Sequence, residues 1–461
     1  MSDESFRDII YTADEEGHRK WVYATQPKGK LYNIRTLVSV LYLVIFFTLP
    51  FLKINGEPLF LFNIPDRQFI IFGFIFWPQD FFLFAMAMLS FLVFIIFFTV
   101  LYGRVFCGWA CPQTVFMEMI FRRIEYWIEG TGDQQRKLNK QPWNREKILK
   151  KSTKHIIFFA VSFLIGNTFL AYIIGVDELF KIVREPLSEN IVLFIVMIGF
   201  SAAFYAVFAF LREMICLFAC PYGRLQGVLL DKHSIVVAYD YKRGEPRGHL
   251  KHGEIEEHNG DCIDCHLCVK VCPTGIDIRN GTQLECVNCT ACIDACNSVM
   301  EKIHKPKGLI RYASENNIAI GEKISFTPRM KAYSVVLLAL MAVFTFLLLT
   351  RTDIEATITR APGQLYQKPD SLHISNLYNV KLTNKTHKEL DVTLKLEELD
   401  GTIKLIGNDI HVKSESLQET TFFLTLSRED ITKMNMPLKI AVYSGDEKIK
   451  SVKTTFFGPP K

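Results

Sequence analysis

Two copies of one cysteine spacing lie close together in the second half of the chain. The first copy reads Cys262-x2-Cys265-x2-Cys268-x3-Cys272, and Pro273 follows it. The second copy reads Cys286-x2-Cys289-x2-Cys292-x3-Cys296, and Asn297 follows it. Cysteine runs of this kind bind pairs of [4Fe–4S] clusters through thiolate sulfur. The repeat therefore predicts a chain that transfers single electrons.

In such runs the first three cysteines bind one cluster and the fourth binds the other. One predicted ligand set is Cys262, Cys265, Cys268 and Cys296, and the other is Cys286, Cys289, Cys292 and Cys272. A pair of zinc knuckles is the alternative, since C-x2-C pairs also bind zinc. Zinc has no use for the repeated third cysteine and the x3 step, so the spacing favours iron–sulfur clusters.

The composition predicts a membrane protein. The chain has 461 residues, of which 49% are hydrophobic, and it contains 38 Phe. A helix needs about 20 apolar residues to cross the hydrocarbon core of a bilayer. Five runs meet or approach this length: Ile34 to Leu52, Phe81 to Leu101, Ile156 to Ile174, Ile191 to Leu211 and Tyr333 to Leu349. None has a polar face, which argues against buried helices of a soluble protein.

Lys and Arg are unevenly distributed between the connections. They are frequent before the first run and between the second and third runs, and sparse in residues 53–79 and 175–190. The positive-inside rule then places the N-terminus and the ferredoxin-like segment in the cytoplasm and the C-terminal part on the outer side of the membrane. No cleavable signal peptide is evident, because mixed-charge residues precede the first run. The net charge of +5 is explained by these loops and does not predict nucleic-acid binding.

A second cysteine motif occurs at the ends of two predicted spans. Cys107-x3-Cys111-Pro112 and Cys216-x3-Cys220-Pro221 are separated by the same interval at each position. We predict two similar hairpins that pack side by side, with Cys111 and Cys220 at breaks where spanning helices give way to interfacial ones.

These four thiols form a second candidate site. The positive end of a following helix, together with Arg104 and Arg224, is expected to favour thiolate. Thiolates prefer Cu(I), zinc or iron–sulfur iron to harder ions. Buried packing is the alternative, because cysteine is among the most buried residue types, and a structural disulfide suits a reducing compartment less well. Copper, another metal and a further cluster all stay open as the bound species.

The predicted fold is an α-helical membrane protein with five transmembrane helices, an inserted bacterial-type 2[4Fe–4S] ferredoxin module and a C-terminal all-β sandwich of immunoglobulin type. The sandwich prediction depends on short alternating stretches such as Leu372 to Leu382 and Leu438 to Tyr443. The predicted domains are an N-terminal cytoplasmic segment (1–33), a four-helix membrane domain (34–239), a cytoplasmic linker with the ferredoxin domain (240–332), the fifth helix (333–350) and the periplasmic domain (351–461).

Over most of its length the chain resembles the FixG/RdxA/CcoG family of cytochrome c oxidase accessory proteins. The resemblance lies in the paired C-x3-C-P spans, the Arg243-Gly-Glu-Pro-Arg-Gly248 linker, the two-cluster segment and the immunoglobulin-like tail. It implies a multi-pass protein of the bacterial inner membrane that takes part in assembling a copper-containing cbb-type oxidase. The second repeat is followed by Asn297, whereas the first is followed by Pro273. This difference leaves the ligand pattern intact.

The resemblance implies an iron–sulfur oxidoreductase that reduces Cu(II) to Cu(I), with copper bound or reduced by Cys107, Cys111, Cys216 and Cys220. The implied partners are membrane lipid, an unnamed cytoplasmic electron donor, a copper chaperone or transporter, and subunits of the oxidase. A homodimer stays open.

Two other functions fit the same residues. One is an electron-relay subunit that passes quinol electrons to a respiratory partner, as resembling proteins of nitrate and nitrous-oxide respiration do. The other is a non-enzymatic assembly scaffold in which the clusters only brace the fold. Reduction of copper would distinguish the copper reductase from the electron relay and the scaffold.

Overall fold

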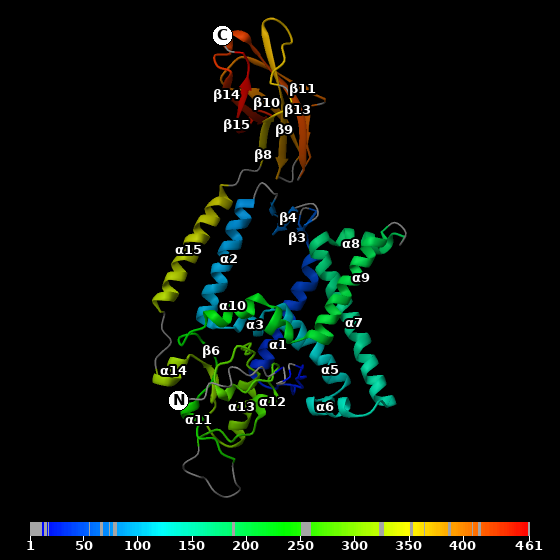
Figure 1. Cartoon of the computed structure of the whole chain (residues 1–461), viewed down its shortest axis with the longest axis vertical. Coiled ribbons are helices and arrows are strands. Elements are labelled where there is room, and N and C mark those ends of the chain that lie inside the picture. Colours follow the sequence, from blue (N-terminus) through cyan, green and yellow to red (C-terminus); the bar gives the residue numbers. More distant parts are fainter. Residues whose placement is uncertain are drawn as a thin grey trace. The chain divides into compact units, whose positions relative to one another are not determined.

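The computed structural model describes residues 12–459 apart from 13–15, 17, 55, 65–67, 73, 77–80, 187–189, 250–259, 322–326, 351–353, 364, 386–388, 408 and 414–415. Part of the predicted linker before the ferredoxin module, residues 250–259, therefore lies outside the described residues. The chain forms two compact units, Met1–Phe344 and Thr345–Lys461. Figure 1 shows helices dominating the first unit and strands the second.

Among the described residues, five helices are long and apolar enough to cross a membrane. They are α1 (Lys30–Thr48), α2 (Phe81–Tyr102), α7 (Arg145–Ile174), α9 (Ile191–Ala206) and α15 (Pro328–Leu349). A 3₁₀ turn (η2, Leu49–Phe51) continues α1, and a π-helix (η5, Val207–Leu211) continues α9. Large apolar side chains are exposed along these helices, as lipid-facing helices require. The five predicted spans are confirmed.

Three of these helices begin earlier than their apolar runs predict. The largest difference is in α7, which begins at Arg145 instead of Ile156. The side chain of Asn144 caps this helix by accepting a hydrogen bond from the Lys147 amide at 2.8 Å. The Lys147 ammonium group donates to the carbonyl oxygens of Asn139 and Gln141. The added turns are polar and mostly exposed, with Lys147 and Lys154 as their buried residues, so hydropathy alone does not detect them.

Short helices contain and follow the first C-x3-C-P motif. They are α3 (Val105–Trp109), α4 (Pro112–Val115), the π-helix η4 (Phe116–Phe121), α5 (Arg122–Ile128) and α6 (Gly132–Lys140). Around the second motif lie the π-helix η6 (Ile215–Ala219) and α10 (Pro221–Leu229). Cys111 and Cys220 have extended backbone angles at the starts of α4 and α10, so the predicted breaks are confirmed.

The other ends of the spans carry short strands and one helix, α8 (Val176–Arg184). A two-stranded sheet pairs β1 (Lys53–Ile54) with β2 (Glu57–Pro58), and a three-stranded antiparallel sheet joins β3 (Phe60–Asn63), β4 (Gln68–Ile71) and β5 (Phe74–Phe76). The apolar segment Phe69 to Trp77, which is too short to span a membrane, contributes β4 and β5; Trp77 itself lies outside the described residues.

The cysteine-rich module lies against the motif-bearing ends of the spans (Figure 1). Strands β6 (Val236–Tyr239) and β7 (Ile310–Ala313) pair antiparallel and enclose the segment between them. That segment carries α11 (Tyr241–Gly244), α12 (Leu267–Lys270), the 3₁₀ turn η7 (Ile278–Asn280) and α13 (Ala291–Lys302), and α14 (Glu315–Ile320) follows β7.

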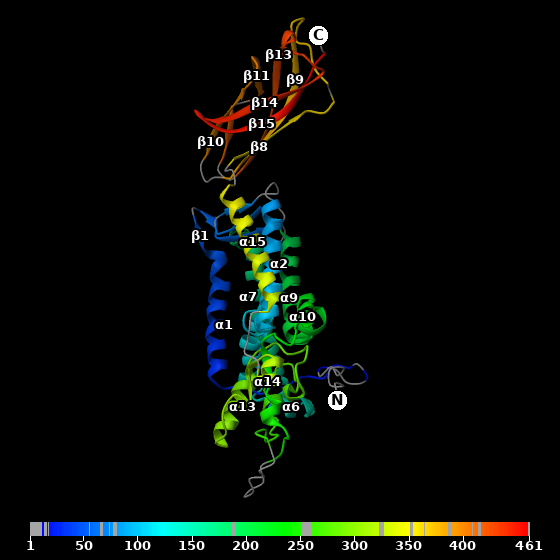
Figure 2. The ribbon, with the colours of Figure 1, turned by 90° about the vertical axis from the view of Figure 1, so that its left-hand side faces the viewer.

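Helix α13 of the module is joined directly to the first spanning helix, beside which Figure 2 places it. The carboxylate of Asp294 accepts hydrogen bonds from the amides of Leu31 (3.2 Å) and Tyr32 (2.7 Å), in the first turn of α1. These amides have no partner within the helix, so Asp294 supplies a cap from a segment more than 250 residues away.

The second unit is a two-sheet antiparallel sandwich. One sheet has the order β11-β13-β9-β8 and the other β12-β10-β14-β15. The strands are β8 (Ile354–Arg360), β9 (His373–Asn384), β10 (Leu390–Leu396), β11 (Gly401–Ile406), β12 (Ile410–Val412), β13 (Leu417–Ser427), β14 (Asn435–Ser444) and β15 (Glu447–Phe457), with the 3₁₀ turn η8 (Arg428–Asp430) after β13. In the core Tyr378 stacks on Phe422 with ring centres 5.4 Å apart. The predicted immunoglobulin-like sandwich is confirmed.

A buried network of opposite charges connects the short helices to the spans. Arg212, which is 2% exposed, follows η5, and both of its terminal nitrogens donate to the carboxylate of Glu125 on α5 at 2.9 Å. Lys154 on α7 lies 3.7 Å from the same carboxylate and 2.9 Å from Glu129. Burial alone would raise the pKa of Glu125, but Arg212, Lys154 and Arg122 outweigh it and the pKa is lowered. The carboxylate therefore stays ionised and holds three elements together.

Replacing Glu125 with Gln should destabilise the first unit by about 3–5 kcal/mol, because Arg212 would then be a buried charge without its carboxylate. Thermal unfolding in detergent measures the effect. The matched control is Glu178→Gln on α8, where the pair with Lys181 at 3.6 Å is half exposed, and it should change stability by less than about 1 kcal/mol. Equal stabilities of the two variants would contradict this role.

The stability that the Glu125 carboxylate contributes should decrease as the pH falls. A carboxyl group with a lowered folded-state pKa contributes stability above its unfolded-state pKa, and that contribution is lost as the pH falls towards the folded-state value. Wild type should therefore lose more stability than Glu125→Gln when unfolding is measured from neutral into acidic pH.

Candidate iron–sulfur and thiol sites

The two cysteine repeats fold alike. Asp264 and Asn288 precede the second cysteine of each repeat, and His266 and Thr290 follow it. All four have positive φ, between 51° and 66°, in the left-handed region that few non-glycine residues adopt. Such a backbone turns sharply around an enclosed space and costs energy unless its surroundings stabilise it. The repeated conformation indicates two equivalent binding loops.

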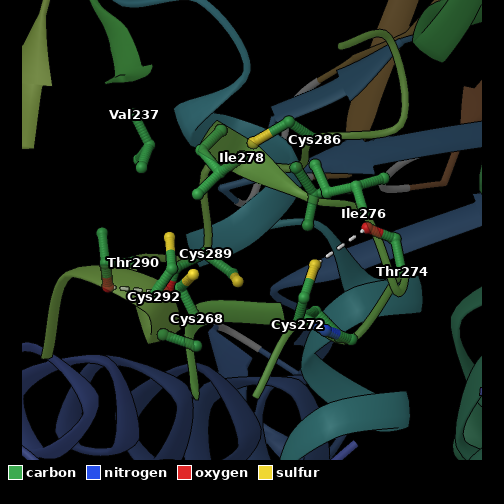
Figure 3. A pocket seen from close by; sticks show the side chains of 13 residues that line it. Val237, Cys268, Cys272, Thr274, Ile276, Ile278, Cys286, Cys289, Thr290 and Cys292 are labelled. Carbon is green, nitrogen blue, oxygen red and sulfur yellow. Dashed lines mark hydrogen bonds between the residues drawn. The ribbon is translucent and has the colours of Figure 1, made fainter. Parts of the chain in front are cut away.

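One pocket is lined by Cys272, Cys286, Cys289 and Cys292, with Cys268 also contributing. Figure 3 shows sulfur atoms of these side chains around a space bounded by apolar residues that include Ile276, Ile278 and Val237. The hydroxyl of Thr274 lies 3.3 Å from the sulfur of Cys272. The first four cysteines are one of the ligand sets predicted from the spacing.

A second pocket is lined by Cys262, Cys265, Cys268 and Cys296. These are the other predicted ligand set, so each pocket combines three cysteines of one repeat with the fourth cysteine of the other. Cys265 is exposed, whereas Cys262 and Cys268 are buried. The second pocket therefore has one side at the surface of the module.

The chemistry of these pockets fits iron–sulfur clusters. Burial raises the pKa of Cys268, Cys286 and Cys296 to about 12, and that of Cys289 to about 11. Buried thiols of this kind become thiolates when cationic iron replaces their protons. In the described part of the chain, no three His, Cys, Asp or Glu side chains are grouped closely enough for a single metal ion. A four-iron cluster needs wider spacing, because each thiolate binds a different iron.

The two C-x3-C-P motifs pack against each other. Arg104, which precedes the first motif, donates to the side-chain oxygen of Gln226 on α10 at 3.1 Å, and the thiol of Cys107 donates to the same oxygen at 2.9 Å. Phe106 and Tyr222 meet edge to face, with ring centres 5.8 Å apart. These contacts pack the two motifs side by side.

The four thiols of these motifs lie close enough to affect one another's ionisation. Cys107 interacts electrostatically with Cys111 and Cys220, and Cys216 interacts with all three. The amides of Gln113 and Thr114 interact with the sulfur of Cys111, as expected at a helix start. The structure thus brings the four predicted residues into one region. Their sulfur atoms are not grouped closely enough to hold a single metal ion as they stand.

The predicted preference for thiolate is wrong for three of these cysteines. Burial raises the pKa of Cys107 and Cys111, and raises that of Cys216 to about 12. Arg104 lowers the pKa of Cys107, but less than burial raises it. The amides at the start of α4 lower the pKa of Cys111, but less than burial raises it, because α4 has only four residues. These thiols are neutral until a cation displaces their protons.

The first motif also contacts the cysteine module through its backbone. Gly108 approaches the second repeat so closely that a Cβ atom there would lie 2.4 Å from the Val287 carbonyl oxygen and 3.0 Å from the Asn288 carbonyl. The carbonyl of Gly108 accepts a hydrogen bond from buried Arg35 of α1 at 2.7 Å. Cys107 packs in one apolar cluster with Val287 and Cys289. The first C-x3-C-P motif and the second cysteine repeat are thus in direct packing contact.

Hydrogen bonds reinforce this contact. The indole nitrogen of Trp109 donates to the hydroxyl of Tyr312 at 3.2 Å, and that hydroxyl donates to the Asn288 carbonyl at 3.3 Å. The Asn288 side chain accepts from the Val237 amide of β6 at 3.2 Å. Sequence reasoning did not find Gly108, Trp109 or Asn288. Their only local signal is that they lie between the cysteines of the two motifs.

Gly108→Ala should push the first motif away from the second repeat, because its methyl group would overlap backbone atoms that cannot rotate away. We expect a loss of about 1–3 kcal/mol in stability, measured by thermal unfolding in detergent. The matched control is Gly199→Ala in α9, where a Cβ meets nothing within 4 Å. A Gly108→Ala protein as stable as the control would refute the close contact.

The comparisons with known proteins agree with this architecture. Residues 211–315 match a family model described as a 4Fe-4S dicluster domain, residues 84–130 match a 4Fe-4S binding domain, and residues 344–459 match the IG-like fold at the C-terminal of FixG.

The curated relatives cover most of the chain. Protein RdxA of Cereibacter sphaeroides is 31% identical, over 88% of this chain and 89% of its own length, and Protein RdxB of the same organism is 34% identical, over 87% of each. The Nitrogen fixation protein FixG of Rhizobium meliloti is 29% identical, over 89% of this chain and 87% of its own. The chain is therefore a membrane-associated iron–sulfur electron-transfer protein that belongs to the FixG/RdxA/CcoG family.

Proposed function

We propose that this protein reduces Cu(II) to Cu(I) for the assembly of a cbb-type cytochrome c oxidase. The observation that carries the proposal is the contact of Gly108 with Val287 and Asn288, which brings a group of soft thiol ligands against the cysteine module. Cu(I) is the copper ion that sulfur ligands prefer, so thiols favour the reduced product.

We assign one cluster to Cys262, Cys265, Cys268 and Cys296 and the other to Cys286, Cys289, Cys292 and Cys272. When bound, such clusters accept and release one electron each. The apolar side chains of Val237, Ile276 and Ile278 shield from water the pocket lined by Cys272, Cys286, Cys289 and Cys292. This environment protects thiolate ligands and influences the potential at which electrons are exchanged.

In this proposal the four thiols of the C-x3-C-P motifs, called here the membrane thiols, bind the copper ion. Cys107, Cys111, Cys216 and Cys220 would close on the ion as it displaces their protons. Gln226 accepts the Cys107 thiol hydrogen bond, and Arg104 lies beside the same sulfur. The balance of the reaction is simple: Cu(II) gains one electron and becomes Cu(I), and each electron comes from the iron–sulfur pair.

The orientation of the chain follows from the distribution of Lys and Arg. The proposal places the module in the cytoplasm and the sandwich in the periplasm. Copper chaperones or transporters and oxidase subunits are the partners this scheme requires, with an electron donor on the side of the module.

The test is Cu(II) reduction by anaerobically purified protein, followed with a Cu(I)-specific chelator. Cys107→Ser combined with Cys216→Ser should lower turnover by about tenfold or more and leave the spectrum of the reduced clusters unchanged, because the removed thiols belong to the copper site. Cys289→Ser should lose both turnover and the signal of the second cluster.

Two results would contradict the proposal. Unchanged turnover in the double variant would remove the membrane thiols from the reaction, and full turnover in Cys289→Ser would remove the second cluster. Zinc(II) added in place of copper is the chemical control, since zinc binds thiolates but accepts no electron.

A further inference from the structure

The first unit contains a cavity that the proposed copper reaction does not use. Its volume is about 640 Å³, within the range of small-molecule sites. It lies between α10, β6, α14 and the loop that precedes Cys286. Figure 1 shows α10 near the lower end of α2, with β6 and α14 below it.

The cavity adjoins the pocket lined by Cys272, Cys286, Cys289 and Cys292. Glu285, which lines the cavity, is followed by Cys286, and Val236 of the cavity wall is followed by Val237 of the cluster pocket. The amide of Cys286 donates to the carbonyl of Gln283, which also lines the cavity, at 3.1 Å. A molecule in the cavity would therefore be separated from the cluster by one layer of residues.

The cavity also reaches the ends of two spanning helices. The hydroxyl of Ser234 donates to the carbonyl of Val100 at 2.8 Å, at the end of α2. Asp231 lies 3.3 Å from Arg329, in the first turn of α15. Beside it, α10 exposes Val228, which is 83% accessible. The wall thus lies at the depth where the apolar spans end, where a molecule dissolved in the bilayer can arrive.

The lining indicates the class of molecule. Apolar side chains such as Leu230, Leu284 and Ala319 alternate with polar ones, so the ligand is amphipathic. Three carboxylates, from Asp231, Glu285 and Glu315, line the cavity; Arg329 pairs with Asp231, and Lys232 is the basic residue of the lining, so a net negative charge remains. This excess of negative charge disfavours phosphate-bearing donors such as flavin or nicotinamide nucleotides. A neutral, ring-shaped, membrane-soluble donor fits better.

We propose that this cavity binds the head group of a membrane quinol, which supplies the electrons. The inference rests on the proposed function, because it requires the cluster pair as acceptor. Oxidation breaks the two O–H bonds of the quinol and gives a quinone, two protons and two electrons. The electrons pass one to each cluster, and the protons leave to solvent past the carboxylates of Asp231 and Glu315.

The first test is reduction of anaerobic holoprotein by decylubiquinol, followed by electron paramagnetic resonance. Ala319→Trp fills the cavity and should slow reduction by quinol about tenfold or more, while reduction by dithionite stays as in wild type. The matched control is Ile320→Trp on the same helix, where the side chain is 73% exposed, and it should match wild type.

The second test measures binding without electron transfer. A photoreactive azidoquinone should label peptides that contain residues 227–236 or 282–285 in wild type, and excess decylubiquinone or Ala319→Trp should prevent the labelling. Labelling confined to other peptides would overturn the site.

The remaining outcomes separate the two proposals. Wild type that is reduced by dithionite but not by quinol would overturn the donor, as would equal quinol rates in wild type and Ala319→Trp. Reduction by a flavin or nicotinamide nucleotide that Ala319→Trp blocks would assign the cavity to that donor instead. Protein without any reducible cluster would refute the proposed function, and the labelling would still decide the quinone site.

Discussion

The packing of Gly108 on the backbone of Val287 and Asn288 is the contact on which the rest of the structure depends. It joins a membrane motif to the cysteine module. The contact is made by main chain, which leaves no room for a side chain at position 108. The helices around it, with Arg35 and Trp109, hold the two surfaces in register.

Different interactions stabilise the protein on the two sides of this contact. On the membrane side, a network of buried charges around Glu125 and Arg212 connects short helices to spans that otherwise offer only apolar surface. Such pairs hold their elements together because separating them would leave charge in an apolar environment. On the module side, apolar residues surround the sulfurs, and the repeated left-handed turns shape each pocket. Metal binding then contributes folding energy, as it does in other small metal-binding domains.

Much of this arrangement could be predicted from the sequence. The spacing of the cysteines predicted two crossed sets, and the structure places each set around one pocket. Hydropathy predicted all five spans, although it missed the polar turns that begin α7 at Arg145 and are fixed by the Asn144 cap. Proline after Cys111 and Cys220 predicted the helix breaks, because proline excludes helical geometry from the residue before it.

Other features depend on tertiary contacts. Strand β15 carries many lysines and threonines, and only pairing with β14 makes it part of the sandwich. The segment from Phe69 is apolar, and a short apolar run does not distinguish strand from helix. The thiols of Cys107 and Cys216 were expected to ionise readily, but the second repeat and α10 bury them. The residues that bury Cys107 lie more than 100 positions away along the chain.

The central claim is that eight cysteines hold two four-iron clusters beside the membrane thiols. Iron and acid-labile sulfide analysis of anaerobically purified protein, together with electron paramagnetic resonance of the reduced state, tests it most directly. The account predicts about eight iron atoms per chain and a spectrum with interaction between two reduced clusters, since Cys268 lines both pockets. Colourless protein that contains zinc, or no iron, would contradict it.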